Sequence, residues 1–288
     1  MTPPGDPNEL VPAMASSVFE GQVRHLKRHY RVVPASEFLA AVEERRRGER
    51  YPVALTFDDD LRCHVAVVLP ILERYGVGAT FFLTGASLER PRSFWWERLE
   101  RALELGVPNL AELVGMRGAG ARPNARELGA FIRQLDSEAR AAVDARLVEV
   151  AGADPLDAGL RVADVRRLVE AGMEIGFHRL RHDNLLLLPE DALAGAMEEG
   201  RRALERAAGM PLEIICYPHG YVDERVANAA RAARFVAGFT TDDGPAPGGD
   251  PLRTGRLGPP LNPGVFAAKL VAVLVRPRSA VVNHPNAP

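Results

Sequence analysis

Residues 51–60 read YPVALTFDDD, a short apolar run that ends in three consecutive aspartates. A run of β-branched and aromatic residues that is apolar on both faces is typical of a buried strand in a parallel sheet. The chain continues with VAVVLPILERYG (65–76), which predicts a helix closed by Gly76, and with GATFFLTG (78–85), a second apolar strand. Strand, helix and strand at this spacing form a βαβ unit, so the sequence predicts a parallel sheet.

The alternation of helix and strand resumes toward the C-terminus. Helices predicted over 164–172, 189–209 and 223–233 lead into three apolar strands: MEIGFH (173–178), LEIICYP (212–218) and FVAGFTT (235–241). Four strand–helix units with polar residues just beyond the strands predict an α/β barrel whose active site lies at that rim.

The remaining segments are predicted to be helical or loosely attached. Two helices are expected before the first strand, at 18–28 and at 35–47, the second with Ser36 as its N-cap. Residues 90–157 are rich in Ala, Leu, Glu and Arg and predict a helical insertion. We therefore expect a mobile lead-in over residues 1–17 and a single barrel domain over 18–288 that carries the insertion.

Composition and charge restrict the classes of partner and compartment. The 288 residues carry a formal net charge of −2, which predicts no nucleic-acid partner and no electrostatic membrane anchor. The N-terminus lacks the basic start and apolar core of a signal peptide, and no stretch reaches the length of a membrane span. The two cysteines, Cys63 and Cys216, are expected to be reduced. These features predict a cytoplasmic protein without membrane insertion, and they leave its oligomeric state open.

Asp58, Asp59 and Asp60 form the first candidate site cluster. Adjacent carboxylates point in divergent directions, so one can bind a metal ion while the next faces the substrate. Packing acidic groups together also makes their joint ionisation costly unless a cation is present. An acidic loop or a cap for the following helix is the alternative.

His178 and His182, in FHRLRHDNL, form the second cluster. Two imidazoles four residues apart lie on one face of a helical turn and can chelate one divalent ion, with a carboxylate as third ligand. Three protein ligands leave positions open for water and substrate, which is the catalytic arrangement. A pair of surface histidines is the alternative, and it is weakened because both residues directly follow a predicted strand.

The third cluster is Tyr217-Pro218-His219-Gly220, where Pro and Gly predict a fixed turn whose backbone amides can bind an oxyanion. Its alternative is an ordinary strand-to-helix turn. Trp95 and Trp96 follow the second strand at the start of the insertion. Their rings either stack on a sugar or anchor the insertion in a buried position.

Together these clusters resemble the polysaccharide deacetylase family, carbohydrate esterase family four. LTFDDD resembles the family's TFDDG motif, HRLRH its H-S/T-x-x-H motif, and YPHG its P-x-G turn, while VVLPILERYGVGATFFL (67–83) resembles the stretch between the first two motifs. The resemblance extends from about Phe19 to Leu270. It implies a distorted (β/α) barrel of about seven strands.

The resemblance also implies a role for each matched residue. Asp58 would be the general base, and Asp59, His178 and His182 would bind zinc, with nickel, cobalt or manganese as alternatives. The backbone N–H of His219 would hold the oxyanion. The residue pattern arrives at the same roles, because a metal polarises the acyl carbonyl and acidifies water while a carboxylate takes the proton.

Four positions depart from the family pattern. Asp60 replaces the motif glycine and either adds a carboxylate beside the metal or caps the next helix, and Arg179 stands where the family has Ser or Thr. Cys216 occupies the place of an arginine that orients the base, and Arg253 or Arg256 could replace that arginine. The family's late histidine, its general acid, has only His284 as a counterpart. His64, His219 and metal-bound water are the other candidate acids, and we expect His284 to be dispensable.

The predicted function is removal of an N-acyl group, in first place N-acetyl, from a small intracellular amino-sugar-containing or similar substrate. One alternative is a metal amidohydrolase acting on a non-sugar amide such as a formamide, imide or ureide. The other is a non-catalytic metal-containing binding protein. An intact Asp58 favours catalysis, because a mere binding protein has no use for a base.

Overall fold

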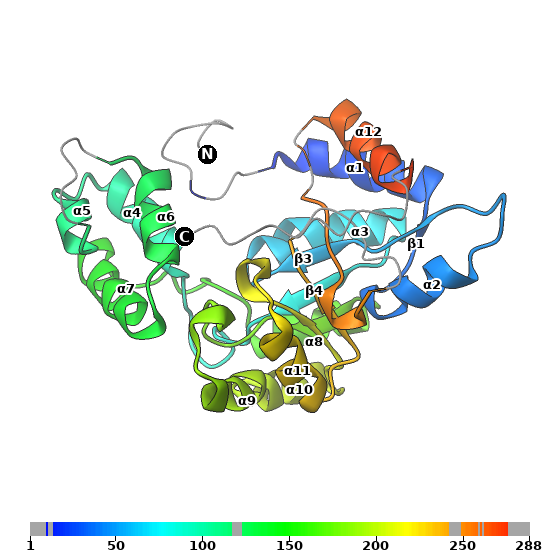
Figure 1. Ribbon diagram of the computed structural model, residues 1–288. Helices are drawn as coiled ribbons and strands as arrows, with labels where there is room; N and C mark the ends of the chain where they lie inside the picture. The colour runs from blue at the N-terminus through cyan, green and yellow to red at the C-terminus, as the bar shows by residue number, and fades with distance from the viewer. Residues whose placement is uncertain are drawn as a thin grey trace.

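The computed structural model describes residues 10, 14–116, 123–241, 249–258, 260 and 262–275. Its centre is a parallel sheet of five strands that follow one another in chain order (Figure 1). These strands are β3 (Thr56–Asp58), β4 (Thr80–Leu83), β5 (Glu174–Phe177), β6 (Ile214–Cys216) and β7 (Ala237–Phe239). Two further strands, β1 (Arg31–Val32) and β2 (Pro52–Val53), pair in parallel with each other. The sheet and its helices form part of a barrel, so the predicted distorted (β/α) barrel with about seven strands is confirmed.

Side-chain alternation along the strands divides the core into two layers. Phe81 and Leu83 face outward into the large apolar cluster shared with the surrounding helices, whereas Phe82 faces inward. Cys216 and Phe239 belong to the same inner cluster as Phe82. Both faces of the sheet are therefore buried, which explains why its strands read as continuous apolar runs.

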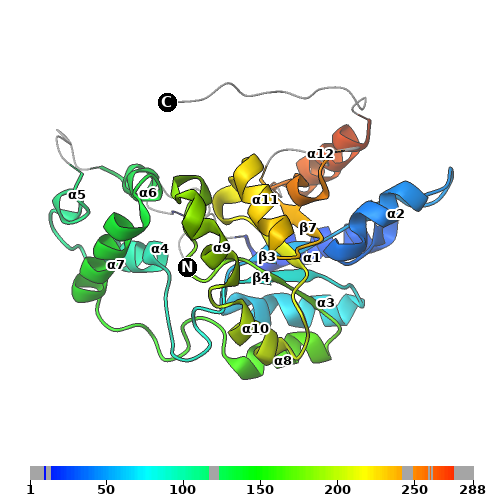
Figure 2. The same ribbon diagram turned by 60° about the horizontal axis from the view of Figure 1, so that its bottom comes forward.

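Helices cover the outside of the sheet, and α3, α8 and α10 follow one another along it (Figure 2). The helices outside the insertion are α1 (Ser16–His29), α2 (Phe38–Glu44), α3 (Leu69–Tyr75), α8 (Val162–Glu170), α9 (Glu190–Glu198), α10 (Arg201–Ala208), α11 (Glu224–Ala232) and α12 (Pro263–Val275). Single helical turns lie at Ala35–Glu37, His64–Val68, Leu185–Leu187, Pro218–Gly220 and Pro251–Arg253. Gly76 ends α3 in the left-handed conformation, with φ 58°, as its position in the sequence predicts.

The prediction of one long helix over 189–209 is wrong. The segment forms two helices, because Gly200 takes φ 82° between α9 and α10 and interrupts the helical hydrogen bonding. A Cβ at this position would lie 2.9 Å from the Cβ of Leu180, so the turn also brings the backbone close to the loop after β5.

The helices α4 (Trp95–Glu104), α5 (Leu110–Leu113), α6 (Ala125–Arg133) and α7 (Ser137–Ala151) make up the region predicted as an insertion. They lie together beside the barrel, at the left of Figure 1. Leu99, Leu128 and Leu147 are fully buried in an apolar cluster of their own. The assignment of the whole chain to one domain stays a prediction.

Several further predictions can be compared with the described residues. No helix within the described residues is both long and apolar enough to cross a membrane. Cys63 and Cys216 are free, as predicted. The predicted lead-in falls largely outside the described residues, and His284 lies outside them altogether.

Candidate metal centre

Three strands deliver the three predicted clusters to one edge of the sheet. Asp58 is the last residue of β3, His178 follows β5, and Tyr217 follows β6. Because the strands are parallel and in register, their carboxyl ends meet at the same edge. The residues that the sequence singles out therefore lie together although they are far apart in the chain.

Asp59, His178 and His182 converge on one point. Oδ1 of Asp59 lies 3.7 Å from Nε2 of His178 and 3.6 Å from Nε2 of His182. A tetrahedral ion with bonds of about 2.1 Å separates its ligand atoms by about 3.4 Å, so this spacing suits a metal such as zinc. One carboxylate and two imidazoles also leave a fourth position for water or substrate.

The ring of His178 is held so that one nitrogen is available to a metal. Its Nδ1 donates a hydrogen bond to the backbone carbonyl of Cys216 at 2.8 Å. Since a carbonyl can only accept, Nδ1 carries the proton and Nε2 presents its lone pair toward Asp59. This is the usual way in which a histidine is oriented for metal binding.

Burial affects the protonation of Asp59 and His182 in this group. Within the described residues, Oδ1 of Asp59 is buried without a hydrogen-bond partner. Burial, followed by the charges of Asp58 and Asp60, raises the pKa of Asp59 well above its ordinary value. Burial and the nearby His178 likewise hold the pKa of His182 well below its usual range. A divalent cation would favour the ionised form of Asp59, and the neutral imidazole of His182 is the form that binds a metal, so the donors fit the metal that the sequence implies.

The two histidines do not lie on a helical turn, which corrects the sequence-based prediction. After β5 the backbone reverses in a tight turn in which the N–H of His182 donates to the carbonyl of Arg179 at 3.3 Å. Arg179 and His182 both take left-handed conformations, with φ 60° and 51°. Such conformations persist only where surrounding contacts hold them. The convergence of the rings is thus produced by a turn rather than by helical periodicity.

A buried ion network holds that turn in place. Arg179, the departure from the family's Ser or Thr, donates to Asp183 at 2.9 Å. Arg140, from α7, also contacts the carboxylate of Asp183 and donates to the carbonyl of Arg181. The helical insertion therefore supports the loop that carries both histidines. Sequence analysis did not identify Arg140, because nothing local marks a helix residue that reaches a loop 41 positions away.

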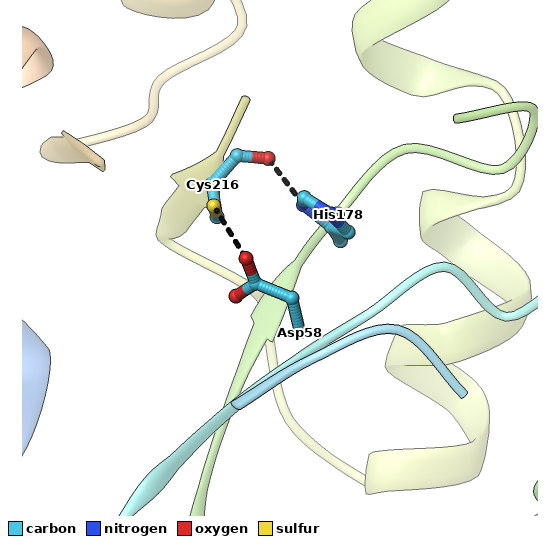
Figure 3. A group of neighbouring side chains, drawn as sticks. All are labelled: Asp58, His178 and Cys216. Atoms are coloured by element: carbon cyan, nitrogen blue, oxygen red, sulfur yellow. Dashed lines mark hydrogen bonds between the residues drawn. The ribbon is translucent and has the colours of Figure 1, made fainter. Parts of the chain in front are cut away.

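A second group of possible ligands lies beside the first and suits a metal less well. Asp58, His178 and Cys216 also come within 4.8 Å of one another, and Figure 3 shows the thiol of Cys216 pointing at Asp58. Burial raises the pKa of the Cys216 thiol well above its ordinary value, whereas a metal needs the thiolate. Asp58 already accepts hydrogen bonds from Arg256 and from the thiol. Of the two groups, Asp59, His178 and His182 therefore suit a metal better.

Arg256 holds the carboxylate of Asp58 through a two-pronged contact, with distances of 2.7 and 2.6 Å. It also donates to the carbonyl of Thr240 at 3.1 Å. Phe239 at the end of β7 forms a parallel β-bridge with Thr254, and this bridge places the nearby Arg256 beside Asp58. Of the two arginines that could replace the family's arginine, Arg256 contacts Asp58, whereas Arg253 is exposed.

The electrostatic consequence for Asp58 is a permanently ionised carboxylate. Burial opposes its ionisation, but the guanidinium of Arg256 outweighs that effect and holds the pKa of Asp58 well below its usual range. A carboxylate held in this way is well oriented but is a weak base. It can take a proton only from a water whose own pKa has been lowered.

Asp60 has a different role from either of those predicted. Its buried carboxylate accepts hydrogen bonds from the backbone N–H and hydroxyl of Thr84, at 2.8 and 2.7 Å, and from Gly85 and Ser87. It neither joins the metal ligands nor caps the following helix. Instead it fastens the loop after β4 to the loop after β3, because the backbone amides after β4 point toward it.

The turn at Pro218–Gly220 presents His219 to the site. His219 has φ 60°, and within the described residues its backbone N–H donates no hydrogen bond. Gly220 follows with φ 77°, and a Cβ there would lie 2.2 Å from Oγ1 of Thr241. The His219 ring lies 4.6 Å from that of His182, and its Nε2 has no partner within the described residues.

Trp95 and Trp96 are only 7% and 8% exposed, which favours the buried anchor over sugar stacking. Both belong to the apolar cluster of the insertion. Trp96 also packs edge-on against His182, with ring centroids 5.3 Å apart. The insertion thus supports the metal ligands from two sides, through Trp96 and through Arg140.

His64 lies in an apolar environment. Its ring packs against Phe57 and Phe81, and burial lowers its pKa to about 4. Since apolar side chains enclose the ring, the structure disfavours His64 as the acid.

Comparisons with known proteins identify the family and the fold. The family model described as polysaccharide deacetylase matches residues 45–111 and 123–238. A search of curated proteins finds no match. Among solved structures, the Streptococcus pyogenes deacetylase PplD in complex with acetate superposes with a TM-score of 0.63 at 17% identity, covering 96% of this chain and 93% of that one.

Two further structures share the fold. IcaB from Ammonifex degensii matches with a TM-score of 0.56 at 16% identity, over 91% of this chain and 93% of that one. The BpsB deacetylase domain from Bordetella bronchiseptica matches with a TM-score of 0.52 at 14% identity, over 88% and 89%. At such identities the structures show a common fold, and the family model, which covers well over half of the chain, supplies the family. The chain is an enzyme of the polysaccharide deacetylase family, whose members are hydrolytic deacetylases acting on amide bonds.

Proposed function

We propose that this chain is a metal-dependent hydrolase that removes an N-acyl group, in first place N-acetyl, from an amino-sugar-containing substrate. The observation that carries the proposal is the buried, unpartnered Oδ1 of Asp59, which faces Nε2 of both His178 and His182. A divalent ion bound there, zinc first and nickel, cobalt or manganese as alternatives, would polarise the acyl carbonyl and lower the pKa of water.

Asp58 is the proton acceptor in this proposal. It adjoins Asp59 in sequence, and Arg256 keeps it ionised and fixed in orientation. It takes the proton of the attacking water, and the backbone N–H of His219 donates to the oxygen that becomes negative as the acyl carbon turns tetrahedral. Positioned donors of this kind stabilise the transition state without reorganisation.

Arg256 is a positioning residue, which gives a first test. Arg256→Lys keeps the charge but loses the two-pronged contact, so we expect kcat to fall about 10-fold, and about 10²-fold in Arg256→Met, with metal content unchanged. Arg253→Lys is the matched control and should stay within twofold of wild type, because Arg253 is exposed. Equal activity of Arg256→Met and Arg253→Lys would contradict the assignment.

The departing amine needs a proton, and the ring of His219 is our candidate donor, because it lies beside the His182 ring and its Nε2 has no partner within the described residues. Burial lowers the pKa of His219 to about 4, so in this proposal the ring takes up its proton during the reaction and not before it. His219→Asn keeps the backbone N–H, because asparagine tolerates a positive φ. We expect it to lower kcat for an N-acetyl substrate by about 10²–10⁴-fold, the usual contribution of a positioned acid. Metal content should be unchanged.

A second substrate separates proton donation from a structural role. The nitrophenolate of p-nitrophenyl acetate leaves without a proton, so His219→Asn should hydrolyse this ester within a few-fold of wild type. An equal loss on both substrates would mean that the substitution damages the oxyanion site or the fold. If His219→Asn hydrolyses the amide within a few-fold of the wild-type rate, the acid is His284 or solvent instead.

The class of substrate is tested by product analysis. Acetate release from N-acetylglucosamine and its short oligosaccharides should exceed formate release from N-formyl amides, each measured with and without metal. The reverse order would favour a non-sugar amidohydrolase, and no release from either would favour a binding protein. A small intracellular substrate and a cytoplasmic location remain part of the proposal.

A further inference from the structure

His178 and His182 differ in how their rings are held. Nδ1 of His178 donates to the backbone carbonyl of Cys216. Nδ1 of His182 is buried, and within the described residues it has no hydrogen-bond partner. Metal-binding histidines are normally oriented through their second ring nitrogen. Among the described residues, it is therefore the backbone and the packing of the ring that set the position of His182.

The backbone around His182 has a conformation that needs support from its surroundings. His182 and Arg179 both have positive φ, 51° and 60°. Residues that carry a side chain keep such a conformation only where surrounding contacts hold it. Arg181 pairs with Glu199 of α9, but the side chain of Arg181 is 62% exposed, and exposed ion pairs contribute little to stability. Buried contacts are therefore the ones that hold the turn.

Arg140 of α7 contacts both the residue before His182 and the residue after it. Its Nη2 donates to the carbonyl of Arg181 at 3.4 Å and forms an ion pair with the carboxylate of Asp183. The side chains of Arg140 and Asp183 are only 7% and 4% exposed, so salt screens this pair little. Arg179 donates to the other oxygen of the same carboxylate, which closes the turn from within. One guanidinium thus fixes the backbone of His182 from both sides.

The helix that carries Arg140 is packed into the insertion. Leu147 of α7 and Leu99 of α4 are fully buried in the same apolar cluster. The helix α4 also carries Trp96, whose ring packs edge-on against the ring of His182. Arg140 and Trp96 therefore belong to one packed unit, which holds His182 by its backbone and by its ring.

We propose that Arg140 is a positioning residue for the metal ligand His182, so that metal binding and the docking of the helical insertion on the barrel are coupled. The inference rests on the metal site proposed above. Coupling free energies are reciprocal. An insertion held by Arg140 therefore raises the affinity for the metal, and a bound metal strengthens the docking of the insertion.

The zinc dissociation constant of Arg140→Met tests the proposal. Methionine is of similar length but makes neither polar contact with the turn. We expect zinc to bind about 10–100-fold more weakly, the range for residues that orient a metal ligand. Arg140→Lys keeps the charge beside Asp183 but loses the planar fork, so its affinity should lie between those of Arg140→Met and wild type.

Arg146→Met is the matched control. Arg146 is an exposed residue of the same helix, and it donates to the carbonyl of Leu113 within the insertion. Arg146→Met should bind zinc as tightly as wild type, because it removes an arginine from α7 without touching the turn.

Unfolding of the metal-free and zinc-loaded proteins separates positioning from a merely structural role. A residue that only stabilises the fold lowers both thermal unfolding midpoints equally and leaves the zinc affinity unchanged. In Arg140→Met, the rise of the midpoint on adding zinc should instead be smaller than in wild type and in Arg146→Met. Equal zinc affinity of folded Arg140→Met and wild type would overturn the proposal. A wild-type protein that binds no zinc would overturn the proposed metal site together with it.

Hydrogen exchange of the wild-type protein tests the reverse direction of the coupling and needs no variant. The amides of α7 should exchange at least about fivefold more slowly when zinc is bound. Those of α2, which lies at the other end of the molecule from α7 in both views (Figures 1 and 2), should slow less. Equal slowing of the two helices, or no slowing in α7, would mean that the insertion does not respond to the metal and would contradict the coupling.

Discussion

Replacing Asp58 by asparagine is expected to lower kcat by about 10²–10⁴-fold, the range for loss of a positioned base, while the chain keeps its metal. Asparagine has nearly the same shape but cannot take a proton from water. The change leaves the proposed metal ligands in place, namely Asp59, His178 and His182. Activity is measured as acetate release, and the metal as its molar ratio to protein.

The matched variant for this prediction is Asp60→Asn. Asp60 accepts hydrogen bonds from Thr84, Gly85 and Ser87 and takes no part in the proposed proton transfer. Asp60→Asn should therefore lower the thermal unfolding midpoint, whereas kcat of the folded protein should fall far less than in Asp58→Asn. If Asp58→Asn loses metal together with activity, the roles of Asp58 and Asp59 have been exchanged.

Removing His178 is expected to have the largest effect, because it removes the metal and all reaction steps that depend on it. His178→Ala should reduce the metal from about one ion per chain to almost none and bring acetate release to background. The ring supplies Nε2 to the metal position, and its Nδ1 anchors it to the carbonyl of Cys216. A site left with two ligands binds a divalent ion far more weakly.

The chain contains its own control for this prediction. His25 and His29 are also four residues apart, on α1, with ring centroids 4.7 Å apart. Within the described residues they belong to no group of converging ligands. The double variant His25→Ala, His29→Ala should keep full metal content. Circular dichroism is used to test whether His178→Ala is folded. A folded His178→Ala protein with wild-type metal content would contradict the proposed ligands.

The fold could be predicted because its determinants are local. The runs TFD, TFFL and IIC lie between turn residues, and Gly76 ends a helix where its left-handed conformation is needed. The break at Gly200 could not be predicted with the same ease, because strong helix formers such as Glu198 and Arg201 flank it. The left-handed backbone of Gly200 makes the break, and the close approach of Leu180, in a distant loop, leaves no room for a side chain there.

The candidate site was predictable to the extent that its residues follow strands. Asp58, His178 and His219 were identified because parallel strands bring their carboxyl ends together. The supporting contacts were not predictable in detail. Arg256 pairs with Asp58 across 198 positions, and two arginines were equally placed in sequence to do so. Periodicity suggested a helical turn for His178 and His182, whereas a tertiary ion network imposes a different backbone.

The most direct test is a crystal structure of the zinc-loaded protein with anomalous data collected at the zinc absorption edge. We predict one strong peak about 2.0–2.2 Å from Oδ1 of Asp59 and from Nε2 of His178 and His182. A peak about 2.3 Å from the sulfur of Cys216, with Asp58 as a second ligand, would contradict the account, because zinc–thiolate bonds have that length. So would the absence of any peak at this edge of the sheet.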